Sequence, residues 1–114
     1  MNKIIAKGFY ETVVIEGIEE YEYLLDNTII DKETNEYWCN FLCLYHNLSD
    51  KQKSIFIRFI KQIIIDTISH VFGIIDGPCT FSVPNTEFKL YINGVDSDME
   101  MQDSFLEYVE LHDK

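Results

Sequence analysis

Basic residues are scarce in this sequence, which has nine Lys and Arg residues against 20 Asp and Glu residues and a formal net charge of −11. A nucleic-acid backbone is also strongly negative, so it would repel this chain and offer no gain from counterion release. The charge therefore excludes a nucleic-acid partner. Disorder is excluded because 46% of the 114 residues are hydrophobic and only 25% are charged. We expect one folded domain over residues 1–114, since this length supports a single core.

Long apolar runs are also missing. The most hydrophobic stretch, 55–75, is interrupted by Arg58, Lys61, Asp66 and His70, whereas a membrane span needs about 20 largely uncharged residues. The first 17 residues contain neither the apolar core nor the small-residue cleavage site of a signal peptide. We therefore predict no contact with a membrane and no secretion.

Cysteine and glycine are each present in small numbers. An odd number of cysteines (Cys39, Cys43 and Cys79) without a secretion signal indicates reduced thiols and a cytoplasmic location. The five glycines are scattered, and none begins a phosphate-binding loop. Binding of ATP, NAD or FAD is therefore not predicted, and we expect no cofactor.

The clearest predicted element is a helix from about Asp50 to about Phe72. Ser49 and Gln52 have the spacing of a capping box, and Gly73 follows as a stop signal. At 100° per residue, one broad arc contains Phe56, Phe59, Ile60, Ile63, Ile64, Thr67, Ile68 and Val71. Ile65 and Phe72 lie outside this arc. We therefore expect this helix to contact protein on more than one face, as a central helix or through a subunit contact.

Shorter elements are predicted on both sides of this helix. Apolar spacings of three and four favour helices over 10–30 and 36–48, although their β-branched and aromatic residues also allow strands. Alternation over 80–92 predicts an antiparallel hairpin with Pro84–Asn85 between its strands. A last helix over 99–111 would be capped by Asp96 or Asp98. The predicted fold class is α+β: a helical domain around one long central helix, with a small antiparallel β-hairpin and a C-terminal helix.

Charge is unevenly distributed along the chain. Residues 1–48 and 74–114 have net charges of −6 and −7, whereas residues 49–73 have a net charge of +2. The first segment contains an acidic and aromatic patch of Glu16, Glu19, Glu20, Tyr21, Glu22, Tyr23 and Asp26. Acids that steer a partner and aromatic side chains that anchor it suit a contact with a basic protein. The alternative is a solvated helix face with half-buried tyrosines.

Asp66 and His70 are four residues apart on the predicted central helix, and Asp76 follows soon after. A carboxylate in this position can orient an imidazole and raise its pKa, as in a general-base pair. No nucleophile motif accompanies them. The alternative is a pair on the helix surface, or polar groups that bond to neighbouring backbone.

Cys39, Cys43 and His46 have spacings that place three soft ligands on one helix face. His70 or Cys79 could supply a fourth ligand. The two separate Cys pairs of common zinc sites are missing from the sequence. Packing into an apolar core is the alternative, because Trp38, Phe41, Leu42 and Leu44 flank these residues, and no metal is predicted.

The second half of the chain contains the run DTISHVFGIIDG at 66–77, a predicted hairpin after it and the run QDSFLE at 102–107. With these parts it resembles small bacterial domains of uncharacterised function. The resemblance implies a bacterial source but no activity.

These observations together favour a non-catalytic, acidic bacterial binding protein of the immunity or regulatory type. Its partner would be a basic protein. A small enzyme or ligand-binding domain that uses Asp66, His70 and Asp76 is the alternative. A metal protein that uses Cys39, Cys43 and His46 is a third possibility. A homodimer through the apolar face of the central helix is compatible with all three.

Overall fold

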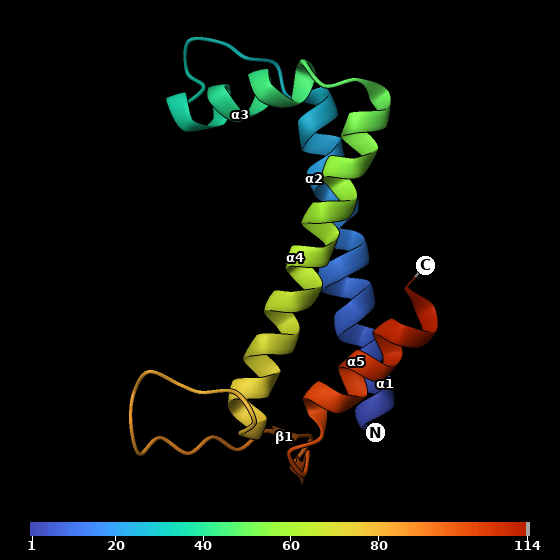
Figure 1. Cartoon of the computed structure of the whole chain (residues 1–114), viewed down its shortest axis with the longest axis vertical. Helices are drawn as coiled ribbons and strands as arrows, with labels where there is room; N and C mark the ends of the chain where they lie inside the picture. Colours follow the sequence, from blue (N-terminus) through green and yellow to red (C-terminus); the bar gives the residue numbers. More distant parts are fainter. Residues whose placement is uncertain (114) are drawn as a thin grey trace.

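The computed structural model describes residues 1–113 and is mostly helical (Figure 1). In chain order the elements are α1 (Asn2–Phe9), η1 (Tyr10–Ile15), α2 (Glu16–Asn27), α3 (Glu36–His46), α4 (Asp50–Asp76), β1 (Tyr91–Ile92), β2 (Val95–Asp96) and α5 (Met101–His112). The structure confirms the predicted fold, which is a helical domain with one long central helix, a small antiparallel hairpin and a C-terminal helix.

The long helix α4 begins where the sequence predicts and ends later. The Ser49 side chain accepts a hydrogen bond from the Gln52 N–H, and Gln52 accepts one from the Ser49 N–H, so the capping box is formed. The predicted end at Gly73 is wrong, because Gly77 ends the helix with a left-handed φ of 104°. Gly73 lies inside the helix, where a Cβ atom would clash with the side chains of Cys79 and Gln102. Within residues 1–113, no helix combines the length and apolar composition needed to cross a membrane.

The N-terminal helix starts eight residues before the predicted start at Tyr10. It runs through α1, the π-helical turn η1 and α2. Its buried residues Ala6, Tyr10, Val14 and Ile18 are four apart. In a pure α-helix this spacing advances about 40° beyond a full turn at each step, so the row would drift around the helix. The wider π turn opposes that drift and keeps the four side chains facing the core.

The hairpin is shorter than predicted and has a different turn. Tyr91 pairs with Asp96 and Ile92 with Val95 around Asn93–Gly94. Both turn residues have positive φ angles, 52° and 79°, as a type I′ turn requires. The predicted strands around Pro84–Asn85 are therefore wrong: residues 78–90 are a loop without strands.

The start of α5 is capped by a residue from α4. The predicted caps Asp96 and Asp98 are wrong, because neither side chain bonds the helix; Asp96 Oδ1 instead accepts from the Asp98 N–H at 2.9 Å. Asp76 Oδ2 accepts the hydrogen bond of the Gln102 N–H at 2.7 Å. The start of α5 is thus capped by a tertiary contact and not by a residue just before the helix, as local spacing had suggested.

Two hydrophobic cores lie at opposite ends of α4. The α5 core has as its buried residues Ala6, Tyr10, Val14, Ile65, Phe72, Met101 and Phe105. The α3 core has as its buried residues Leu25, Leu42 and Tyr45. Ile65 and Phe72 are the two residues outside the predicted arc, so the expectation that α4 contacts protein on more than one face is confirmed.

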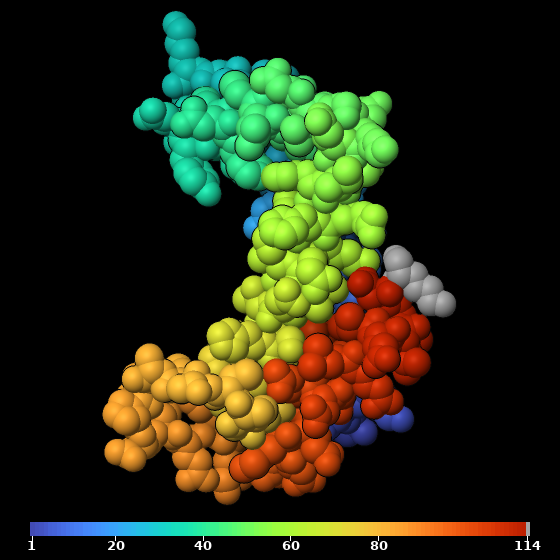
Figure 2. All heavy atoms as spheres, viewed as in Figure 1, coloured from blue at the N-terminus to red at the C-terminus, as the bar shows by residue number. Residues whose placement is uncertain are grey.

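The molecule is elongated, with extents of 48 × 33 × 23 Å. Figure 2 shows α3 with its neighbouring loop and the 78–90 loop projecting to the same side of α4. The middle of α4 lies uncovered between them in this view. The surface is therefore concave along the central helix.

Candidate functional site

The predicted acidic and aromatic patch lies on α2, and its seven side chains are all exposed. At 100° per residue, most of its members share about one third of the helix circumference, with Glu22 beside them. The acidic α2 face consists of Glu16, Glu19, Glu20, Glu22, Tyr23 and Asp26. Tyr21 is separated from this face and lines a hollow with Leu25, Trp38 and Phe41. The buried Ile18 and Leu25 anchor α2 from its other side.

The carboxylates of the acidic α2 face have no basic neighbour in an ion pair among residues 1–113. The ion pairs in that part of the chain join Lys3 to Glu107, Lys7 to Glu11 and Lys61 to Asp113. Negative charge therefore accumulates on this face and creates a field that attracts cationic groups.

Asp26 also holds α2 against α3. Its Oδ1 accepts a hydrogen bond from the Tyr45 hydroxyl at 3.0 Å. Burial, followed by this bond and the negative charge of Asp26, raises the pKa of Tyr45 from 10.0 to about 12. Asp26 thus fixes the C-terminal end of the acidic α2 face while its own side chain stays exposed.

Asp66, His70 and Asp76 do not share one environment, although all lie on α4. Asp66 is exposed and accepts a hydrogen bond from the Gln62 side chain at 2.8 Å. His70 is also exposed. Asp76 is only 6% exposed and lies against the start of α5. Asp76 lines a cavity.

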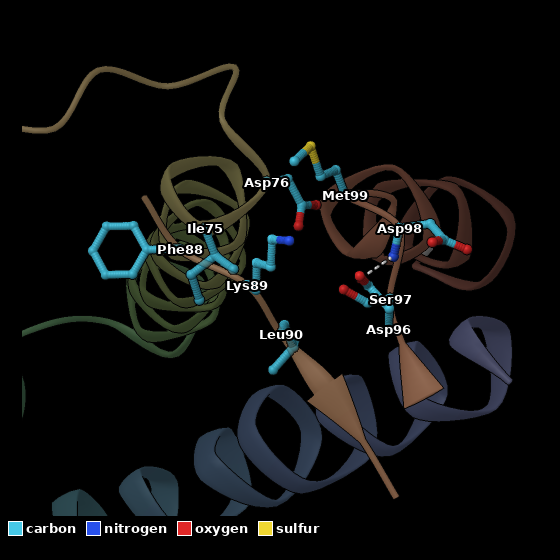
Figure 3. A pocket seen from close by; sticks show the side chains of 9 residues that line it. All are labelled: Ile75, Asp76, Phe88, Lys89, Leu90, Asp96, Ser97, Asp98 and Met99. Carbon is cyan, nitrogen blue, oxygen red and sulfur yellow. Dashed lines mark hydrogen bonds between the residues drawn. The ribbon is translucent and has the colours of Figure 1, made fainter. Parts of the chain in front are cut away.

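The Asp76 cavity has a volume of about 250 Å³ and lies between the end of α4 and the hairpin (Figure 3). Charged residues in its lining are Asp76, Lys89, Asp96 and Asp98. Asp76 Oδ1 is buried and has no hydrogen-bond partner in residues 1–113, because only Oδ2 bonds the backbone of α5. Asp98 and the adjacent Met99 both have left-handed φ angles, 57° and 58°. The cavity therefore combines an unsatisfied acceptor with a strained backbone segment.

The cysteine and histidine pattern is formed on α3, but its members differ in exposure. Cys43 and His46 are exposed. Cys39 is half-buried, and its Sγ lies 3.5 Å from the Thr34 carbonyl oxygen. Within residues 1–113, no group of three or more His, Cys, Asp or Glu side chains is placed to hold a metal ion.

One polar network was not predicted from the sequence. Asp113 follows α5, and its Oδ1 pairs with Lys61 Nζ and accepts a hydrogen bond from the Tyr10 hydroxyl at 2.6 Å. Burial acts to raise the pKa of Asp113, but the hydrogen bonds from Lys61 and Tyr10 outweigh it and lower this pKa below its usual value. These residues come from η1, α4 and the end of α5. No local spacing signals a contact between residues so far apart in the chain.

Comparisons of this chain with family models, with curated proteins and with solved structures find no match. The resemblance carried by residues 66–77 and 102–107 therefore stays a prediction.

Proposed function

We propose that this chain is a non-catalytic bacterial binding protein that contacts a basic protein in the cytoplasm, as an immunity-type protein or a small regulator would. The observation that carries this proposal is the acidic α2 face. Its carboxylates are exposed on one rigid helix and belong to no ion pair within residues 1–113.

Charge supports a protein partner with a positive surface. Fixed carboxylates on a helix accelerate encounters with a cationic surface and disfavour acidic competitors. Tyr23 is 68% exposed within the same face, and tyrosine is a frequent anchor at protein interfaces because it buries a large area with few rotatable bonds. The face therefore combines steering and anchoring groups.

The experiment is a binding titration against purified basic proteins encoded by genes adjacent to that of this chain. One variant reverses charge on the face: Glu16→Lys, Glu19→Lys and Glu20→Lys. The matched control reverses three exposed acids elsewhere: Glu33→Lys, Glu87→Lys and Glu110→Lys. Both variants change the net charge equally, so only the position of the change differs.

We expect the association rate to fall about tenfold or more in the α2 variant and much less in the control. Affinity of the unchanged protein should also weaken as salt is added, because exposed charges are screened over about 10 Å at 0.1 M salt. An affinity insensitive to salt, or equal losses in the two variants, would contradict recognition through the acidic α2 face.

A further inference from the structure

The middle of α4 presents one face that no other helix or strand of residues 1–113 covers, although Asp113 lines a hollow beside it with Arg58 and Phe59. The α4 free face consists of Ile55, Arg58, Phe59, Gln62, Ile63 and Asp66, and each of these residues is exposed. At 100° per residue they fall within about 140° of the helix circumference. Phe59 is 64% exposed and its neighbours Ile55 and Ile63 are 57% and 48% exposed. Three large apolar side chains thus follow one another along two helical turns.

This face includes part of the arc that the sequence marks as apolar. Phe59 and Ile63 belong to the predicted arc, whereas the buried residues of α4 in the α5 core are Ile65 and Phe72. The chain's own helices therefore cover other faces of α4 and leave apolar residues exposed on this one. A contiguous exposed apolar patch bordered by polar residues is typical of a protein interface.

The accessible surface of the chain is too large for a compact monomer. Its value is 8338 Å², whereas a compact protein of 13.4 kDa exposes about 6,500 Å². The radius of gyration is 17.6 Å against about 13 Å for a compact domain of this length. The surplus of about 1,800 Å² is spread over the whole elongated chain and includes the α4 free face; the smaller obligate homodimers bury approximately 1,000 Å² on each partner.

We propose that the α4 free face binds a second copy of this chain, with the two α4 helices antiparallel about a two-fold axis near Gln62. Gln62 lies midway between Arg58 and Asp66, so this symmetry places Arg58 of each copy opposite Asp66 of the other. Phe59 then lies beside Ile63 of the second copy. The two-fold relation forms each contact twice, as an isologous interface requires.

Charge complementarity between Arg58 and Asp66 supports a second copy as the occupant. Residues 49–73 have a net charge of +2, whereas residues 1–48 and 74–114 have net charges of −6 and −7, so two copies repel each other less at α4 than at those acidic segments. Among residues 1–113 Arg58 forms no ion pair, and Asp66 bonds only the neutral amide of Gln62. Each copy thus supplies a cation and an anion at symmetric positions.

The first experiment measures the mass of the full chain by sedimentation equilibrium at micromolar concentration. We expect twice the chain mass of 13.4 kDa. Phe59→Glu should weaken dimerisation about tenfold or more, because it removes a central apolar anchor and buries a charge. The matched control is Ile4→Glu at an apolar position on α1 that is 74% exposed. Far-UV circular dichroism of each variant verifies that the helices are intact.

The second experiment tests the antiparallel register by charge reversal. Arg58→Asp places two carboxylates opposite each other, and Asp66→Arg places two guanidinium groups opposite each other. Each single variant should therefore dimerise about tenfold or more weakly. An equimolar mixture of the two variants should recover dimers, because every cross-interface pair is then again one cation and one anion. The Arg58→Asp, Asp66→Arg double variant should dimerise by itself for the same reason.

A monomeric mass for the unchanged chain would overturn the proposal. So would a dimer that Ile4→Glu dissociates and Phe59→Glu does not, since it would use α1. Dimers that form without recovery in the mixture would overturn the antiparallel register. None of these variants touches the acidic α2 face, so failure of this proposal is distinguishable from failure of recognition of a basic protein.

Discussion

The two ends of the molecule are built differently, although α4 contributes to both. The α5 core has seven buried hydrophobic residues from α1, η1, α4 and α5. The α3 core has three, from α2 and α3, with half-buried Phe56 and Ile57 of α4 packed against them. Because buried apolar area is the main favourable contribution to folding, the α5 core should be the more stable end. The α3 core should open locally at a lower free energy.

The largest expected effect follows from truncating the centre of the α5 core. Phe105 is fully buried and its ring packs against Phe72 with centroids 5.9 Å apart. Phe105→Ala should lower the free energy of unfolding by about 3–5 kcal/mol, since it leaves a cavity between three elements. Urea unfolding measures this loss. The neighbouring Leu106 is 42% exposed, so Leu106→Ala is a matched control that should cost about 0.5 kcal/mol. Similar losses in the two variants would mean that Phe105 is not central.

A smaller and more local effect is expected in the α3 core. Leu42→Ala should cost about 2–3 kcal/mol, because the half-buried neighbours Trp38 and Phe41 can move into the space. Trp38 is the only tryptophan of the chain, so its fluorescence reports this end. We expect the fluorescence transition in urea to precede the loss of helical circular dichroism. The exposed Leu44→Ala serves as control. Coincident transitions in Leu42→Ala would contradict unequal stability of the two ends.

The smallest expected effect is a difference in how the two ends contribute to the pH dependence of the free energy of unfolding. The lowered pKa of Asp113 means that its network stabilises the folded state above the ordinary pKa of aspartate, and that this contribution is lost as pH falls through the lowered value. The pKa of Tyr45 is raised to about 12, so its contribution is present below pH 10 and is lost as pH rises through about 12. At neutral pH each of these hydrogen bonds should contribute about 1 kcal/mol.

Two variants separate these contributions. Asp113→Asn should reduce the acid dependence of the free energy of unfolding, and Tyr45→Phe should reduce its alkaline dependence. Urea unfolding across the pH range measures both. If Asp113→Asn leaves the acid dependence unchanged, the network at the end of α5 does not contribute as the geometry implies.

Local signals in the sequence predicted most of the fold. Ser49 and Gln52 identified the start of α4, because a capping box depends only on residues three apart. The errors arose where tertiary contacts decide. Gly73 has the chemistry of a helix end, but it is needed where Cys79 and Gln102 pack closely against α4. Asp76 caps α5 from another helix, which no spacing near Met101 could show.

The candidate site likewise has features that local sequence predicts and features that depend on tertiary contacts. The acidic α2 face was predictable because most of its residues recur at spacings of three and four on one helix, and helical periodicity then places them together. The same periodicity turns Tyr21 about 100° away from Glu20, toward the hollow that it lines with Trp38 and Phe41 of α3. The Asp113 network was not predictable, since Tyr10 and Asp113 are separated by almost the whole chain.

The packing of the two chain ends against each other has a consequence for synthesis on the ribosome. Ala6 and Tyr10 emerge early, but the α5 core that buries them is completed only by Met101 and Phe105. The α3 core needs only residues 25–57 and can form while α5 is still untranslated. During that interval the apolar side of α1 lacks its partner α5. The less stable end of the finished protein is therefore the end whose residues are complete first.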